Sequence, residues 1–181
     1  NNLDENDKIE ILQYKDMGLV QEVFNNLILN ELKGRAAVGH VGYTTAGSGS
    51  RMNAQPLVSK YQKGTFALVH NGNLVNVESM RKELEDKGAI FQTNNDSEII
   101  AHLMAKERIK TNSTAEAMLK LMGEISGAYS IIILTPKRMV VARDPQGFKP
   151  LCMGVIGKSY VFASESCALD AVGAEFARDV E

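Results

Sequence analysis

The chain is poor in the residues that most often build disulfide frameworks and metal centres. It has two cysteines, three histidines and no tryptophan among 181 residues. Two cysteines cannot form the framework that small secreted domains use, so we expect a reducing, cytoplasmic compartment. The sequence shows no short ligand spacing such as Cys-x-x-Cys, so we expect no metal and no cofactor. Cys152 and Cys167 lie in apolar stretches, which predicts buried structural cysteines and not nucleophiles.

The sequence also lacks a strong charge of either sign and any long hydrophobic run. Its 20 basic and 22 acidic residues give a net charge of −2. We therefore expect no nucleic-acid partner and no attraction to a membrane surface. The apolar runs are too short to span a bilayer, and the first ten residues are polar and acidic, unlike a signal peptide.

The chain does contain enough apolar residues for one sizeable core, since they make up 44% of it. Their patterns give strands, then paired helices, then consecutive antiparallel strands, which favours an α+β domain over a doubly wound parallel sheet. The expected strands are 8–14, 35–41, 65–70, 129–134, 139–143, 151–155 and 160–163. The first expected helix covers 18–33, with a break near 25–26. The second lies between its cap Asn76 and its stop Gly88, and the third starts in Asn95–Glu98. The last two cover 114–126 and 167–172, the latter capped from Ser164–Ser166.

A strand-like run ends at His70-Asn71-Gly72-Asn73, which allows two interpretations. Asn-Gly after a strand is typical of a tight turn. The Asn71 amide and the Gly72 N–H could instead donate together to one developing negative oxygen, as an oxyanion hole requires. The dipeptide alone favours the turn.

Two other segments carry the same kind of ambiguity. Residues 44–53 are rich in glycine and serine, which suits either a surface loop or a lid that closes over a ligand. In the segment Asn95-Asp96-Ser97-Glu98, a carboxylate at a helix start could bind a ligand ammonium or simply stabilise the helix.

Taken together and in order, these segments resemble the glutaminase domains of the amidophosphoribosyltransferase family, which are class II glutamine amidotransferases. The resemblance covers about residues 17–181 and rests on GLVQEVF, GHVGYTTAGS, NAQPL, LVHNGNLVN, FQTNNDSEII, GAYSIIIL, ARDPQGFKPL and FASESCALD. It implies the N-terminal-nucleophile fold, a four-layer α/β/β/α sandwich of two antiparallel sheets between helix layers.

The resemblance also implies a reaction. An N-terminal cysteine thiolate attacks the side-chain amide of glutamine, with its own α-amine as the base. A thioester forms, ammonia leaves, and water then releases glutamate. The ammonia passes to a phosphoribosyltransferase domain, which attaches it to phosphoribosyl pyrophosphate in purine biosynthesis.

Site residues follow from the resemblance position by position. Asn71 and Gly72 match the oxyanion hole, and Asp96 matches the residue that binds the substrate α-ammonium. The further substrate-binding candidates are Gly42, Tyr43, Thr44 and His70. His40 leads into the loop at 42–53, and Asn73 and Arg143 match positions of structural support.

The sequence departs from the family pattern at several positions. It begins with Asn1, and we expect the segment with the cysteine, the first strand and the first helix to be missing from residues 1–181. Gly42 replaces an arginine that binds the glutamine carboxylate, and losing such a partner costs on the order of 1.5–3 kcal/mol. Asn95 replaces a serine, and Phe148-Lys149 replaces Val/Ile-Arg.

Two interpretations remain open from the sequence. Residues 1–181 could be an N-terminally incomplete glutaminase domain, without a phosphoribosyltransferase domain and inactive as printed because the nucleophile is absent. They could instead form a degenerate, non-catalytic relative that acts as a binding or scaffolding module, which the internal change at Gly42 favours. The expected partners are glutamine, a phosphoribosyltransferase domain or chain, and a second copy in a homo-oligomer.

Overall fold

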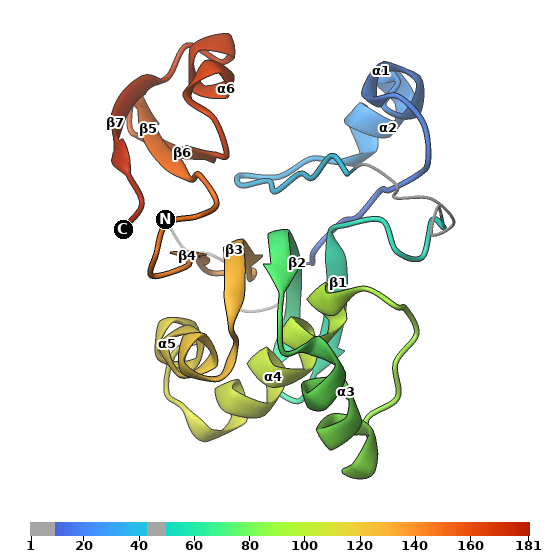
Figure 1. The fold of residues 1–181 in the computed structure, drawn as a ribbon. Coiled ribbons are helices and arrows are strands. Elements are labelled where there is room, and N and C mark those ends of the chain that lie inside the picture. Colours follow the sequence, from blue (N-terminus) through green and yellow to red (C-terminus); the bar gives the residue numbers. More distant parts are fainter. Residues whose placement is uncertain (1–9, 43–49) are drawn as a thin grey trace.

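A four-stranded antiparallel sheet forms the centre of the fold (Figure 1). The computed structural model describes residues 10–42 and 50–181. The strand order is β1-β2-β3-β4, so each strand pairs with its neighbour in sequence. The strands are β1 Leu57–Tyr61, β2 Gly64–Leu74, β3 Gly127–Leu134 and β4 Met139–Arg143. Such a meander needs only short connections between the paired strands β1 and β2, and β3 and β4.

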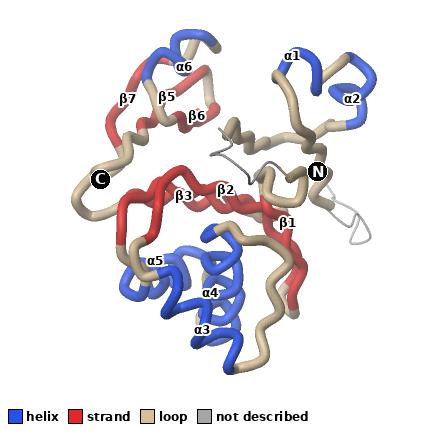
Figure 2. Tube along the Cα trace, turned by 45° about the vertical axis from the view of Figure 1, so that its right-hand side comes forward, coloured by secondary structure: helices blue, strands red, loops and turns tan. Residues whose placement is uncertain are grey.

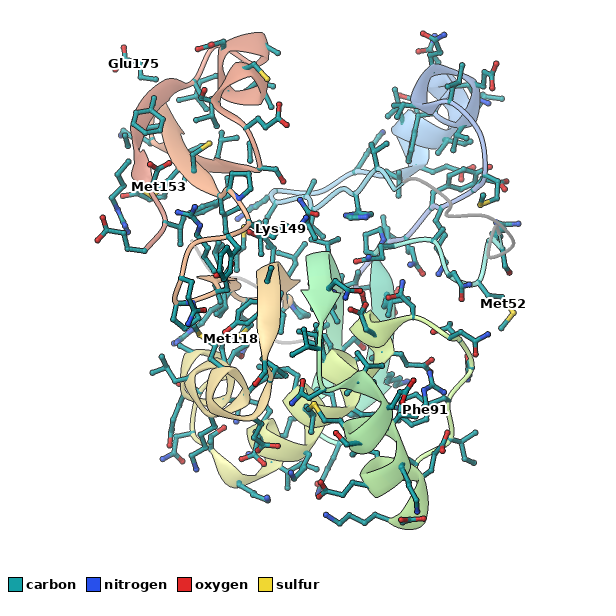
Figure 3. The ribbon with its side chains drawn as sticks, in the orientation of Figure 1. Met52, Phe91, Met118, Lys149, Met153 and Glu175 are labelled. Atoms are coloured by element: carbon teal, nitrogen blue, oxygen red, sulfur yellow. The ribbon has the colours of Figure 1, made fainter. Side chains whose placement is uncertain are left out.

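Three helices cover one face of this sheet and bury the main core against it (Figure 1). They are α3 Val77–Asp86, α4 Asp96–Lys110 and α5 Thr114–Glu124. Met118 on α5 belongs to this core, and Figure 3 shows it beside the sheet. The fully buried members include Leu68, Ile99, Ile100, Leu121, Ile131 and Ile133. The helical spacing of the apolar residues on α4 and α5 therefore predicted the buried faces correctly.

A second, three-stranded antiparallel sheet with order β6-β5-β7 lies on the other side of the first sheet (Figure 2). Its elements are β5 Cys152–Ile156, β6 Ser159–Ala163, β7 Glu175–Asp179 and the short helix α6 Ser166–Ala171. From α6 the layers run helix, sheet, sheet, helix, which confirms the expected α+β architecture with two antiparallel sheets between helices. β1 and β7 were not expected from the sequence. Glu175–Asp179 has no apolar alternation, and in the structure every one of its residues is exposed.

The connection between the two sheets is held by two charged residues at the end of β4. The Arg143 guanidinium donates to the carbonyls of Lys149 at 2.6 Å, Gly147 at 2.7 Å and Val180 at 3.2 Å. The buried Asp144 carboxylate accepts backbone N–H groups from the same turn and from β3. Figure 3 shows Lys149 at the level between the sheets. The predicted supporting role of Arg143 agrees with these contacts.

Residues 10–42 differ most from the sequence predictions. The helix expected at 18–33 is two short helices, α1 Val20–Val23 and α2 Asn26–Glu31, with the break close to the expected place. The strand predictions for 10–14 and 35–41 are wrong, because these residues have no regular secondary structure. An apolar run has strand propensity, but a strand also needs a hydrogen-bonded neighbour, and none of the described strands pairs with these segments. Residues 8 and 9 lie outside the described ranges.

Two predicted helix caps also differ from the structure. The Asn76 side chain does not cap α3; it bonds the carbonyl of Glu124 and the N–H of Ser126, which fastens the start of α3 to the end of α5. α6 begins after Glu165 without a side-chain cap. The other two signals hold, since Asn95 caps α4 and Gly88 ends α3 with a positive φ of 89°. No helix of the described residues is long and apolar enough to cross a membrane.

The sequence prediction of a strand ending at His70 is wrong in its end point. β2 continues through Asn71, Gly72 and Asn73 to Leu74, and all of them pair with β3. Asn-Gly is a turn signal only when the chain reverses, and here the β3 ladder holds it extended. Gly72 is required because its φ is 155° and an added Cβ would lie 2.0 Å from the carbonyl oxygen of Ala128.

This close approach predicts that Gly72→Ala destabilises the protein by at least about 3 kcal/mol, because the β2–β3 ladder must open to admit the methyl group. Gly123→Ala is the matched control. Gly123 lies in α5, and no described residue comes within 4 Å of an added Cβ, so alanine should stabilise the helix by about 0.5–1 kcal/mol. Urea unfolding of both variants checks the two signs, and equal stabilities would contradict this account of Gly72.

Candidate functional site

The candidate site lies along the part of β2 that extends beyond β1. The β1 ladder ends with Leu57 opposite Leu68, whereas β3 pairs with β2 as far as Leu74. Alternate residues of an antiparallel strand turn their N–H and C=O groups to opposite sides. His70, Gly72 and Leu74 therefore turn these groups away from β3, toward the side that β1 does not reach.

Side chains take the place of a strand at two of these three positions. The Gln55 side chain accepts from the His70 N–H at 2.6 Å and donates to the His70 carbonyl at 3.0 Å. The Asp96 carboxylate accepts from the Leu74 N–H at 3.2 Å. Gly72 lies between them, with its backbone groups on the same side. The structure thus places the predicted oxyanion-hole glycine between two side chains that hold its neighbours.

Asp96 is held at the start of α4 by several donors. Its carboxylate lies 3.4 Å from His70 Nδ1, which is also 3.2 Å from the Ser97 hydroxyl. Burial raises the pKa of Asp96, but the hydrogen bond and charge of His70 and the N–H groups of Leu74 and Ser97 outweigh it and lower the pKa below its usual value. Asp96 is therefore an anion at neutral pH, with 17% of its side chain exposed.

His70 and Asn71 point to opposite faces of the first sheet, as alternation along a strand requires. The buried His70 ring faces α4, where its Nε2 has no hydrogen-bond partner among the described residues. The Asn71 amide faces the second sheet, where its Nδ2 lies 3.5 Å from the hydroxyl of Ser164. Of the predicted site residues, His70 and Asp96 are in contact with each other, whereas the Asn71 side chain reaches away from both.

Gly42 and His40 lie close to each other on the segment before the loop. An added Cβ on Gly42 would be 3.5 Å from His40 Nε2, which is ordinary van der Waals contact. Burial, followed by the charge of His70, lowers the pKa of His40. His40 is therefore neutral at pH 7. The predicted residues Tyr43 and Thr44 lie outside the described residues.

Two hollows open next to these residues. The first, of about 650 Å³, lies between the end of β2 and the starts of α3 and α4. Asp96, Glu78 and four asparagine residues line it, namely Asn73, Asn76, Asn94 and Asn95. The second, of about 420 Å³, contains Ser164, the partner of Asn71, together with Cys152 and Asp179. Both volumes fall in the range of about 300–1,000 Å³ that small-molecule sites occupy.

The cysteine prediction is half right. Cys152 is buried, and its thiol donates to the carbonyl of Ala163. Cys167 is exposed, because α6 turns it toward solvent, so the prediction of burial is wrong there. Within 10–42 and 50–181, no group of three His, Cys, Asp or Glu side chains could hold a metal ion.

Three contributors to this site were not predicted from the sequence to be site residues. They are Gln55, which bonds the backbone of His70, Ser97, which bonds the His70 ring, and Ser164, which bonds Asn71. Gln55 belongs to the NAQPL segment and Ser164 to FASES, so both lie in motifs that carry the family resemblance. Residue spacing gives no hint of their contacts, because each bridges elements far apart in the sequence.

Known proteins similar to this chain share the same family and fold. Residues 44–171 match the family described as "Glutamine amidotransferase domain". The amidophosphoribosyltransferase of Bacillus subtilis is 44% identical over 173 residues, which is 95% of this chain and 36% of that protein. The amidophosphoribosyltransferase of Archaeoglobus fulgidus is 45% identical over 94% of this chain and 37% of its own length. The chain therefore spans little more than a third of these relatives.

Solved structures agree with this result. The glutamine phosphoribosylpyrophosphate amidotransferase from B. subtilis, complexed with ADP and GMP, superposes with a TM-score of 0.83 at 44% identity. The match covers 91% of this chain and 35% of that protein chain. A structure described as the allosteric regulatory enzyme of purine biosynthesis gives a TM-score of 0.85 at 45% identity, with the same coverage of both chains. The chain belongs to the glutamine amidotransferase domain family.

Proposed function

We propose that this chain is the glutamine-binding part of an amidophosphoribosyltransferase and binds glutamine along the free edge of β2. The observation that carries the proposal is the position of Gly72 between two bonded residues. On one side, Gln55 bonds the backbone of His70, and on the other, Asp96 accepts from the Leu74 N–H. The edge presents a backbone donor beside a half-buried carboxylate. A free amino acid with a carboxamide side chain offers the complementary groups, an amide oxygen and an ammonium.

The residues act on the two ends of glutamine in different ways. The Gly72 N–H and the Asn71 side-chain amide donate to the carboxamide oxygen, which becomes negative when a nucleophile attacks the carbon. Neutral donors suit this task because they stabilise the charge as it develops. Asp96 receives the α-ammonium, and the donors around it keep it ionised.

The proposed role extends to the larger protein through the relatives. Ammonia released from glutamine would pass to a phosphoribosyltransferase region, which forms phosphoribosylamine in purine biosynthesis. This region is a proposed partner, because the chain spans only 36% of the B. subtilis relative. The cytoplasmic location and the homo-oligomer expected from the sequence stay predictions.

A second candidate function is a non-catalytic binding module. Gly42 supports it, because an arginine that would bind the glutamine carboxylate is absent from an internal position. Among the described residues, only the His40 ring lies within 4 Å of an added Cβ at this position. Binding of glutamine without turnover distinguishes this function from that of an active glutaminase.

The role of Asp96 predicts that Asp96→Asn weakens glutamine binding by about tenfold to a hundredfold, because an ammonium loses its anionic partner. In the unchanged chain, binding should persist as the pH falls through the usual carboxyl range and disappear only below the lowered pKa of Asp96. Calorimetric titration with glutamine at several pH values measures both effects. Asp86→Asn, an exposed substitution at the end of α3, is the control and should leave binding unchanged.

The departure at Gly42 predicts that Gly42→Arg tightens glutamine binding by about tenfold or more, because a guanidinium can pair with the α-carboxylate in a bidentate way. Gly42→Lys is the matched control. It restores the charge without the planar fork and should gain less affinity. If neither variant binds glutamine more tightly than the unchanged chain, Gly42 does not lie at the carboxylate end of the ligand.

The chain as printed should release no glutamate from glutamine. Burial raises the pKa of the Cys152 thiol, which disfavours its thiolate. Cys167 lies on the surface with its thiol 3.5 Å from the Glu165 carboxylate, and neither cysteine is the N-terminal residue that the family reaction requires. A coupled glutamate assay on the purified chain measures this, and a blank without protein sets its baseline. Turnover that disappears on alkylation of the exposed cysteine would contradict the prediction.

A further inference from the structure

Gln55 occupies a position that the β1–β2 register assigns to a strand residue. Leu57 pairs with Leu68 and Val58 with Ala67, so each step back along β1 is one step forward along β2. Continued by two residues, the register sets Gln55 opposite His70. The ladder nevertheless ends at Leu57, and Gln55 bonds His70 through its side chain instead.

The Gln55 side chain reproduces the two bonds of a ladder pair. In a hydrogen-bonded antiparallel pair, two residues exchange both N–H···O bonds. A carboxamide has the same acceptor and donor as a peptide group. Gln55 Oε1 accepts from His70 N at 2.6 Å, and its Nε2 donates to His70 O at 3.0 Å. The half-buried Gln55 therefore extends the hydrogen bonding on this side of β2 to His70, two residues before Gly72.

The segment that carries Gln55 is itself bonded to the start of α4 and to the segment before α1. The side-chain amide of Asn95, the N-cap of α4, donates to the Asn53 carbonyl at 3.3 Å. The Lys15 ammonium donates to the Ala54 carbonyl at 2.8 Å. Residues 53–55 thus link the edge of β2 to the residue that precedes Asp96.

We propose that Gln55 is a positioning residue that acts as a one-residue substitute for a strand and sets the distance between the Gly72 N–H and the Asp96 carboxylate. It holds the His70 backbone, so the next edge position, Gly72, stays extended with its N–H facing the ligand. Gln55 itself does not touch the ligand. The inference deepens the proposed function, and only its ligand-binding consequence depends on that function.

Amide hydrogen exchange followed by NMR tests the substitute strand without any ligand. Gln55→Met keeps the length of the side chain and removes both bonds, so the His70 N–H should exchange about tenfold faster or more. The Val69 N–H, which faces β3, should exchange as before. Gln55→Glu keeps the acceptor for the His70 N–H, so exchange there should stay within about threefold of the unchanged chain. Gln21→Met, at an exposed position of α1, is the control.

Ligand discrimination tests the positioning of Gly72. Gln55→Met and Gln55→Glu should each weaken glutamine binding about tenfold, because each loses the bond to the His70 carbonyl and lets the edge move. L-norvaline has the same ammonium and carboxylate but no side-chain amide, so its affinity should change by less than about twofold. If Gln55→Met does not fold, Gln55→Glu carries this measurement, because the two side chains have nearly the same size.

Each outcome decides a separate question. Unchanged His70 exchange in Gln55→Met, or equally fast exchange in Gln55→Glu, would overturn the substitute strand. An equal loss of glutamine and norvaline binding, or no loss of either, would overturn the positioning of Gly72. If the unchanged chain binds no glutamine, the proposed function fails, whereas the exchange result still decides the role of Gln55.

Discussion

The structure of this site depends on one constraint, which is that the backbone of a strand must find hydrogen-bond partners on both sides. β3 satisfies one side of β2 throughout, but β1 stops opposite Leu68. Beyond that point the fold supplies side chains, Gln55 at His70 and Asp96 at Leu74. Gly72 lies between these two bonded positions, and its backbone groups turn to the same side of β2.

The same arrangement fixes the charge at the site. Asp96 is partly buried, which by itself would favour its neutral form. The His70 ring and two backbone N–H groups reverse that tendency and keep the carboxylate ionised. Partial burial, followed by the charge of His70, lowers the pKa of His40 and favours its neutral form. The ionised Asp96 carboxylate thus lies near the edge position of Gly72, which suits a ligand with an ammonium group.

Rigidity around the site comes from contacts that cross between layers. Arg143 binds three carbonyls and connects the end of β4 to the chain that leads into and out of the second sheet. The second sheet in turn contributes Ser164 beside the Asn71 amide. The candidate site is thus assembled from both sheets and from the start of α4.

The sequence by itself determined the helices α3 to α5, the apolar strands of the second half of the chain and the family, because these depend on local patterns and on motifs read in order. It did not determine that β2 runs through Asn71-Gly72, that 35–41 stays unpaired in the described structure, or that Glu175–Asp179 forms a strand. Pairing is a property of two segments at once, so local propensity cannot decide it. Only the tertiary structure brought Gln55 to His70 and Asp96 to Leu74, because hydrogen bonds between distant residues exist only once the chain has folded.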